Sequence, residues 1–209
     1  MRLSQAVLAI ADISGYTGFV HQPELSLVHA EQIVTALLDT VIDRAAHPLT
    51  LNKLEGDAAL LYAEYQGPAG PVVRDILAQA GEFFGAFEQT RQRLQQDRSA
   101  CGCEACRGIE RLRLKVLLHL GEIAIKQVRQ FTELAGRPLI LLHRLLKNGV
   151  PSHEYLLLSE DCATAAAPLE GLTWLDEEVE GVGPARVAYL LATPAGLAGL
   201  PRLPAAAKP

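Results

Sequence analysis

The sequence predicts an α+β fold in which helices cover a mostly antiparallel sheet. Apolar runs of strand length recur along the chain, two long segments repeat apolar residues at helical spacing, and glycine-containing turns separate neighbouring strand-like runs. The expected order is β-α-β-β-α-β-β-α-β-α-β-β, and we find no internal repeat. Such an order packs helices against a sheet. With 209 residues, the chain is long enough for one domain with a full core.

The first part of the chain predicts a strand, a helix and a hairpin. Residues 6–11 form a buried apolar strand that ends at the acidic turn DISGYTG. A helix is expected from about Leu25 to Ala46, because apolar residues recur there at helical spacing. The runs LTLNKLEG and DAALLYAEY then read as two strands joined by a tight Gly56-Asp57 turn.

The second part predicts one long helix and a mixed set of shorter elements. The helix runs from about Gly70 to Arg98 and is followed by a loop over residues 100–108. RLRLKVLLHLG and EIAIKQV are expected to be a second pair of strands, and RPLILLHRLLKNG a helix closed by Gly149. A strand (EYLLLS), a short helix (EDCATAAA) and a closing hairpin follow. We expect a single domain over residues 1–193, in which 100–108 is an insertion, and a flexible tail over 194–209.

Composition excludes several classes of protein. The net charge of −5 and the absence of a dense Lys/Arg stripe argue against nucleic acid as a partner. No run of about 18 apolar residues is present to span a membrane, and the N-terminal apolar run is too short for a secretion signal. Four cysteines in a chain of this length do not form a secreted disulfide framework. We therefore expect a cytoplasmic protein whose partners are small molecules or proteins.

Two acidic residues at strand ends, Asp12 and Asp57, each stand close to a glycine. Carboxylates on rigid strands can hold two Mg²⁺ or Mn²⁺ ions roughly 4 Å apart, which neutralise a triphosphate and activate a hydroxyl. The turn after Asp12 offers backbone N–H groups from Ser14, Gly15, Tyr16 and Thr17 as a cradle for phosphate. The simpler interpretation is that Asp12 caps a helix and Asp57 belongs to a hairpin turn.

Several segments together resemble one known family. ADISGYTGF is similar to the metal-binding segment of class III adenylate and guanylate cyclases, and KLEGDAALLYAE is similar to their strand-turn-strand segment. RLKVLLHLGEIAI, FTELAGRPLILLHRLL and EGVGPARVAYLL resemble later segments of that family in the same order. The resemblance covers about residues 6–192 and implies the ferredoxin-like fold of the class III nucleotidyl cyclase catalytic domain.

The resemblance also implies a role for individual residues. Asp12 and Asp57 would be the metal ligands, with the carbonyl of Ile13 as a further ligand. Lys53 and Glu133 would contact the purine and favour ATP over GTP. Arg144 would stabilise charge on the reacting phosphate, as a fixed cationic fork can. In the family these groups come from both subunits of a head-to-tail dimer, so the resemblance implies a homodimer.

One position departs from the family pattern. The family places an asparagine one helical turn before the arginine to orient the ribose, and this chain has Ile140 there. Residues four apart share one side of a helix, so an apolar side chain stands beside Arg144. Loss of one positioning group commonly costs about a hundredfold in rate. Arg144 and Lys53 can alternatively be ordinary solvated side chains.

Three cysteines, Cys101, Cys103 and Cys106, form a C-x-C-x-x-C pattern in the loop after the long helix. Closely spaced thiolates are good ligands for zinc or another soft metal, but a closed Zn²⁺ site needs four ligands and the spacing supplies three. Cys162 is far away in sequence. Reduced, partly exposed thiols or a redox-sensitive pair are the alternatives.

These observations support three hypotheses about function. The first is a divergent adenylate cyclase-like domain that binds metal-ATP, with cyclic AMP formation weak or absent because of Ile140. The second is a non-catalytic nucleotide-binding or dimerisation module in signalling. The third is a metal- or redox-responsive interaction protein that acts through the cysteine loop.

Overall fold

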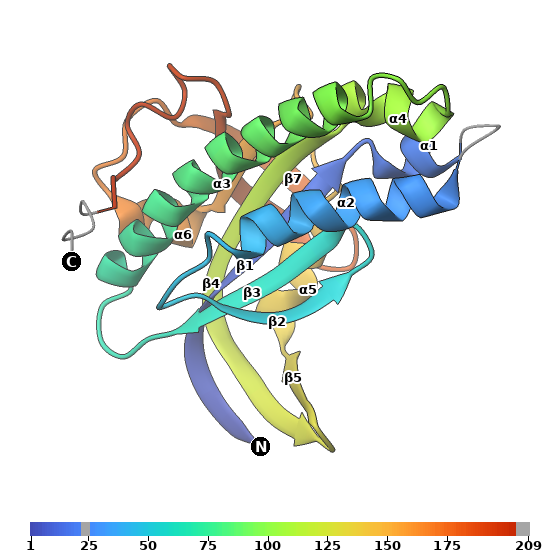
Figure 1. The fold of residues 1–209 in the computed structure, drawn as a ribbon. Helices are drawn as coiled ribbons and strands as arrows, with labels where there is room; N and C mark the ends of the chain where they lie inside the picture. The colour runs from blue at the N-terminus through green and yellow to red at the C-terminus, as the bar shows by residue number, and fades with distance from the viewer. Residues whose placement is uncertain (22–25, 204–209) are drawn as a thin grey trace, which may run out of the picture.

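The computed structural model describes residues 1–21 and 26–203. Within these residues the chain forms one sheet of eight strands, in the order β2-β3-β1-β4-β6-β8-β7, with β5 paired to β4 at one end (Figure 1). Every pairing is antiparallel except that of β4 with β6. The predicted mostly antiparallel α+β fold is confirmed. The strands are β1 (Arg2–Ser14), β2 (Thr50–Glu55), β3 (Ala58–Glu64), β4 (Arg113–Val128), β5 (Phe131–Ala135), β6 (Tyr155–Ser159), β7 (Thr173–Val179) and β8 (Gly183–Leu191).

Two long helices, α2 (Leu27–Ile42) and α3 (Gly70–Asp97), pack side by side on one face of this sheet (Figure 1). Side chains alternate between faces along a strand. In β1, Val7 and Ala9 accordingly join the core beneath these helices, while Leu8 and Ile10 point to the opposite face. The helix α6 (Glu160–Ala166) extends the first core toward β6 and β8.

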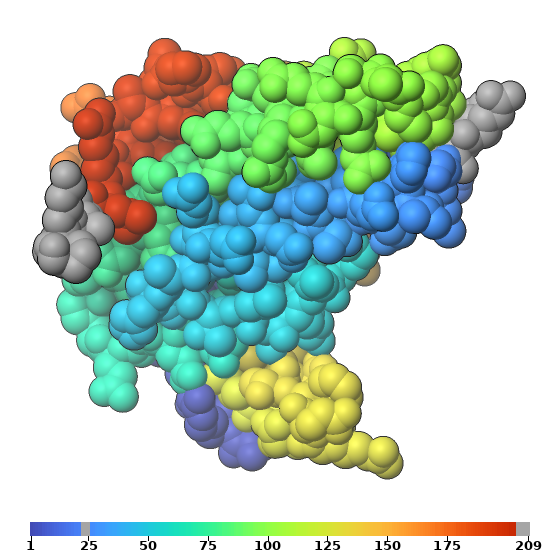
Figure 2. All heavy atoms as spheres, viewed as in Figure 1, coloured from blue at the N-terminus to red at the C-terminus, as the bar shows by residue number. Residues whose placement is uncertain are grey.

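The opposite face is covered mainly by the short helix α5 (Arg137–Arg144), which contacts β1 and β4. A second apolar core lies beneath it and includes Leu117 and Leu142. Several large apolar side chains of β2, the β4–β5 hairpin and α5 are more than 45% exposed; they are Leu54, Val128, Phe131 and Ile140. The outer ends of β4 and β5 project from the body of the molecule as an arm (Figure 2).

The two strands expected over RLRLKVLLHLG and EIAIKQV are in fact one strand, β4. Residues 113–128 form one continuous strand, because Gly121 is not a turn residue but a point of close packing. A Cβ atom at Gly121 would lie 2.6 Å from Pro138 in the first turn of α5, so only glycine lets the helix approach there. The partner of the outer half of β4 is β5, which pairs Ala124 with Ala135.

Other boundaries differ from the sequence-based expectation by a few residues. The structure describes α2 from Leu27 to Ile42; the expected start at Leu25 lies outside the described residues. The helix α5 ends at Arg144, short of Gly149. The cysteine loop contains a short helix, α4 (Glu104–Gly108), followed by a 3-10 turn, η1 (Ile109–Arg111).

The expected C-terminal tail is partly packed. Residues 194–203 are described, and in this stretch Leu200 is buried while Leu197 packs against the core cluster under α3. The side chain of Leu200 lies against α3 at Gly81, where an added Cβ atom would be 3.5 Å from it. Residues 204–209 lie outside the described part of the chain.

Among the described residues, no helix combines the length and the apolar character that crossing a membrane would require.

Candidate functional site

Asp12 and Asp57 lie at the same end of two neighbouring strands. Asp12 is near the end of β1, where it is paired in register with Ala58, the residue after Asp57. Gly56, with a φ of 68°, makes the turn between β2 and β3 that carries Asp57. The N–H of Ile13 donates to the carbonyl oxygen of Asp57 at 3.0 Å, which ties the turn to β1. The β2–β3 turn and its pairing with β1 therefore bring the two acidic residues together.

Burial and the charge of Asp12 both act on the carboxyl group of Asp57. Burial, and then the negative charge of Asp12, raise the pKa of Asp57 from 3.8 to about 6, against smaller opposing contributions from its own backbone N–H and from Lys115. Two carboxylates that disfavour each other's charge are a typical binding site for a divalent cation, which relieves the repulsion. The donor set therefore fits a hard metal ion.

A lysine that the sequence analysis did not single out completes this site. Lys115 of β4 is the cross-strand partner of Asp12, and its Nζ lies 3.1 Å from Oδ2 of that residue. Both side chains are less than one-fifth exposed. Lys115 also donates to the carbonyl of Leu146 at 3.3 Å. A lysine inside the apolar run RLKVLLHL was the available signal, because such a residue is rarely buried without a partner.

The expected phosphate cradle follows Asp12 directly. Ser14 is buried, Gly15 takes a φ of 91°, and the five-residue helix α1 (Tyr16–Val20) begins there. A Cβ atom at Gly15 would lie 3.2 Å from the carbonyl oxygen of Arg111, so the turn packs closely against η1. Burial raises the pKa of Tyr16, whose hydroxyl donates to Glu31 of α2 at 3.4 Å.

The predicted purine-contacting pair is brought together by the fold. Nζ of Lys53 in β2 lies 2.8 Å from Oε2 of Glu133 in β5, and each side chain is about one-third exposed. Beside them, the amide of Asn52 donates to the carbonyl of Thr132 at 2.8 Å. Because Lys53 pairs in register with Leu60, a member of the core under α5, the side chain of Lys53 lies on the same face of the sheet as Asp12.

Arg144 lies apart from the carboxylates within this chain. Its guanidinium is 3.2 Å from Glu180 in the β7–β8 turn, and the side chains are 50% and 84% exposed. Ile140, one turn earlier on α5, is 56% exposed. His143 is occupied elsewhere, with Nε2 at 2.7 Å from Glu55 and Nδ1 at 2.8 Å from the carbonyl of Leu139. Among the described ion pairs, none joins Arg144 to the Asp12 site.

The cysteine loop gains a fourth side chain that sequence reasoning missed. Nδ1 of His29, in the first turn of α2, lies 3.4 Å from Sγ of Cys103, 3.5 Å from Sγ of Cys101 and 3.6 Å from Sγ of Cys106. Cys162 is fully buried in α6. No spacing rule links residue 29 to residue 101, so only the packing of α2 beside α4 reveals the group.

The thiols of this cluster differ in their acidity. The pKa of Cys103 is lowered to about 6, chiefly because the backbone N–H of Cys106 donates to its sulfur. Burial, with the neighbouring thiols, raises the pKa of Cys106 to about 11. The four side chains offer one imidazole and three sulfur donors, a set suited to a soft or borderline cation.

Several solved structures of class III adenylyl and guanylyl cyclases share this fold. The guanylyl cyclase Cya2 aligns over 90% of this chain and 92% of its own, with a TM-score of 0.67 and 14% identity. The adenylyl cyclase CyaB from P. aeruginosa aligns over 90% and 94%, with a TM-score of 0.67 and 16% identity. The guanylate cyclase domain of RhGC from Catenaria anguillulae, in complex with GTP, aligns over 90% and 97%, with a TM-score of 0.63 and 14% identity. The expected cyclase fold is confirmed.

Sequence comparison adds a relative and a family. A protein of Mycobacterium tuberculosis (strain ATCC 25618 / H37Rv), Uncharacterized protein Rv2561/Rv2562, is 36% identical over 156 residues, which are 74% of this chain and 71% of that protein. Residues 34–155, more than half of the chain, match the family described as Protein of unknown function (DUF2652). The chain therefore belongs to the DUF2652 family, and its fold is that of the class III nucleotidyl cyclase catalytic domain.

Proposed function

We propose that this protein binds a nucleoside triphosphate, ATP in preference to GTP, together with Mg²⁺ or Mn²⁺, and forms cyclic AMP slowly or not at all. The observation that carries the proposal is the convergence of Asp12, Asp57 and Lys115 at one end of β1, β3 and β4. Two carboxylates and one ammonium group on rigid strands suit a ligand that combines divalent cations with phosphate oxygens.

The metal ligands would be the carboxylates of Asp12 and Asp57 with the carbonyl of Ile13. The raised pKa of Asp57 supports this assignment, because a divalent cation would offset the desolvation and repulsion that raise it. When bound, two ions would neutralise charge on the triphosphate and activate the attacking hydroxyl. Residues Ser14 to Thr17 would present backbone N–H groups to phosphate oxygens.

Lys115 would exchange partners when nucleotide binds. In the free protein its ammonium group balances Asp12 at 3.1 Å. A divalent cation at the carboxylates would take over that role, and the lysine would then be available to a phosphate oxygen. A compact, flexible ammonium group suits such a role as a point charge on phosphate.

The Lys53–Glu133 pair supports a preference for adenine. The lysine can donate to a ring nitrogen, while the carboxylate can accept from the exocyclic amino group of adenine, which guanine replaces with an oxygen at that position. Proteins of this fold have been solved with both bases: RhGC with GTP, and a rhodopsin-guanylyl cyclase with converted specificity with ATPalphaS.

A head-to-tail homodimer would complete the site. Arg144 is held by Glu180 rather than by the carboxylates of its own chain, so it would serve the Asp12 site of a second copy. The exposed apolar side chains of Phe131 and Ile140 would be covered in that contact. In the cyclase reaction the ribose 3′-hydroxyl attacks the α-phosphate and releases pyrophosphate. Ile140 offers no hydrogen bond to orient the ribose, so this step would be slow.

The test is nucleotide binding and product formation by the same protein samples. Wild type and Asp57→Ala are titrated with ATP and with GTP in the presence of Mn²⁺ by calorimetry, and the mixtures are analysed for cyclic nucleotides by mass spectrometry. We expect wild type to bind ATP more tightly than GTP, and Asp57→Ala to bind neither measurably. Asp43→Asn, at the exposed end of α2, is the matched control and should behave as wild type. Failure of wild type to bind either nucleotide would refute the proposal.

A further inference from the structure

The side chains of His29, Cys101, Cys103 and Cys106 converge where α4 meets the first turn of α2. Their ligand atoms all lie within 4.8 Å of one another, and the Sγ atoms of Cys101 and Cys103 are 3.6 Å apart. None of these cysteines forms a disulfide, and Cys106 is buried. Three polarizable sulfur atoms and one imidazole nitrogen thus enclose a common centre.

We propose that these four side chains bind a single Zn²⁺ ion as a closed structural site. In a tetrahedral site with Zn–S bonds of about 2.3 Å and Zn–N bonds of about 2.0–2.1 Å, neighbouring ligand atoms lie roughly 3.5–3.8 Å apart. The observed separations of 3.4, 3.5 and 3.6 Å from Nδ1 of His29 to the three sulfur atoms fit that tetrahedron. The set Cys₃His is one of the common structural zinc sets.

The geometry distinguishes a single ion from the alternatives. An iron–sulfur cluster contains several metal and sulfide atoms between its protein ligands, and four ligand atoms that all lie within 4.8 Å of one another leave no room for them. A disulfide requires two sulfur atoms at about 2.0 Å and would leave the remaining thiol and the imidazole without a role. Four protein ligands also fill the coordination shell, so no position is open for a substrate.

The site would fasten the segment that follows Asp12. A Cβ atom at Gly108, the last residue of α4, would lie 2.9 Å from the ring of Phe19, so α4 packs directly on α1. Gly15 likewise packs closely on η1, since a Cβ atom there would lie 3.2 Å from the carbonyl oxygen of Arg111. Because zinc would join α4 to α2, the ion would hold α1 between them. The inference goes beyond nucleotide binding, since it concerns a second metal centre with its own ligands.

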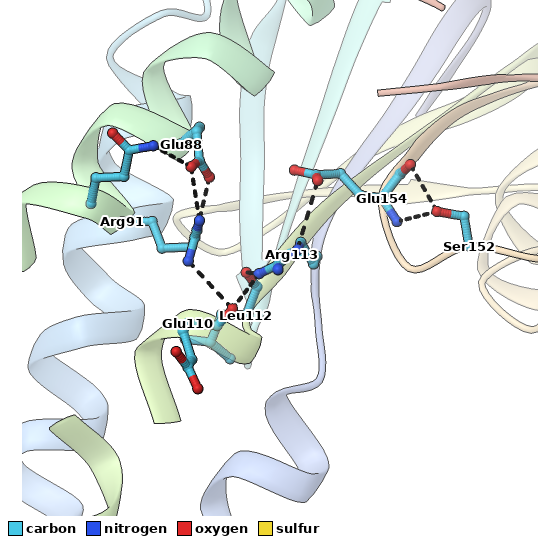
Figure 3. Close-up of polar contacts among 8 residues, drawn as sticks. Glu88, Arg91, Glu110, Leu112, Arg113, Ser152 and Glu154 are labelled. Atoms are coloured by element: carbon cyan, nitrogen blue, oxygen red, sulfur yellow. Dashed lines mark hydrogen bonds and ion pairs between the residues drawn. The ribbon is translucent and has the colours of Figure 1, made fainter. Parts of the chain in front are cut away.

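The far end of the same loop is fixed by a polar network rather than by metal (Figure 3). Arg91 of α3 is paired with both carboxylate oxygens of Glu88 at 2.8 Å and donates to the carbonyl of Glu110 at 3.3 Å. Arg113 of β4 also donates to the carbonyl of Glu110 and to that of Leu112. The η1 end of the loop is therefore held by guanidinium groups, and the cysteine end depends on its own cluster.

The first test measures metal content. Wild type, Cys103→Ser and His29→Ala are purified under reducing conditions and analysed by plasma mass spectrometry, with Cys162→Ala and His153→Ala as matched controls. Cys162 is buried in α6 and His153 is exposed, and neither belongs to the cluster. We expect about one Zn²⁺ per chain in wild type and both controls, and loss of most of it in the two cluster variants.

A second measurement keeps the test decisive if the cluster variants do not fold. Wild type is stripped of metal in the presence of reductant and titrated with Co²⁺, which should produce thiolate-to-cobalt charge-transfer absorption and tetrahedral ligand-field bands at one equivalent. Zn²⁺ should abolish both, and hydrogen exchange over residues 13–20 should be faster in the metal-free protein than in the zinc form. Absence of Co²⁺ and Zn²⁺ binding, an iron–sulfur absorption spectrum, or unchanged exchange over 13–20 would overturn the proposal.

Discussion

Asp57 is expected to lower the stability of the protein above pH 6, and Asp57→Asn should therefore raise it. The folded protein shifts the pKa of this carboxyl from 3.8 to about 6. A group with a raised pKa binds its proton more tightly in the folded state, so ionisation favours the unfolded state and the penalty grows as pH rises from about 4 to about 6. Asparagine has the same shape without the charge.

The magnitude follows from that shift. Each pKa unit corresponds to about 1.36 kcal/mol, so the full penalty is at most about 3 kcal/mol at pH 8 and about 1 kcal/mol at pH 4.5. Because the site is partly open to water, we expect about half of these values. Asp57→Asn should thus increase the free energy of unfolding by about 1.5 kcal/mol at pH 8 and by only about 0.5 kcal/mol at pH 4.5.

Urea denaturation at both pH values, in buffer without Mg²⁺ or Mn²⁺, measures the difference. Asp43→Asn, an exposed carboxylate at the end of α2, controls for the general change in net charge. Addition of Mn²⁺ should stabilise wild type but not Asp57→Asn, because a ligand that binds only the folded state raises its stability. A variant that is less stable than wild type at pH 8, or equally affected at both pH values, would refute the electrostatic reasoning.

Three further changes test other parts of the site. Gly15→Ala should lower the free energy of unfolding, measured by urea denaturation, by about 1–2 kcal/mol. Gly15 has a φ of 91°, and a Cβ atom there would crowd the carbonyl of Arg111. An unchanged stability would contradict this packing. Glu133→Gln should reduce the preference for ATP over GTP measured by calorimetry. It should change the free energy of unfolding by less than about 1 kcal/mol, since its ion pair with Lys53 is one-third exposed. An unchanged preference would show that the pair does not select the base. Ile140→Asn should increase cyclic AMP formation by about a hundredfold without unfolding the single chain, in which this side chain is 56% exposed; no increase would show that another group limits turnover.

Local patterns in the sequence were sufficient for most of the fold. The periodicity of residues 70–97 and the turn at Gly56 depend on neighbours along the chain, and the structure has the expected helix and hairpin there. The long strand β4 was predicted wrongly as two, because the local rule treats Gly121 as a turn. Its actual role is to let Pro138 of α5 approach the sheet, a contact between segments that local rules cannot represent.

Some residues of the candidate site could likewise be identified from local sequence, and others only from the structure. Asp12 and Asp57 could be identified because each stands at a strand end in a recognisable turn. Lys115 could be noticed as a lysine inside an apolar run, but its partner Asp12 follows only from cross-strand register. His29 could not be identified, since its place beside the cysteines arises only from the packing of α2 against α4. Local sequence thus determined most of the helices and strands and the acidic turns, because these depend on short-range propensity and on the alternation of apolar residues. Only the tertiary structure decided which distant side chains share one centre, because long-range contacts form when complete helices and strands pack together.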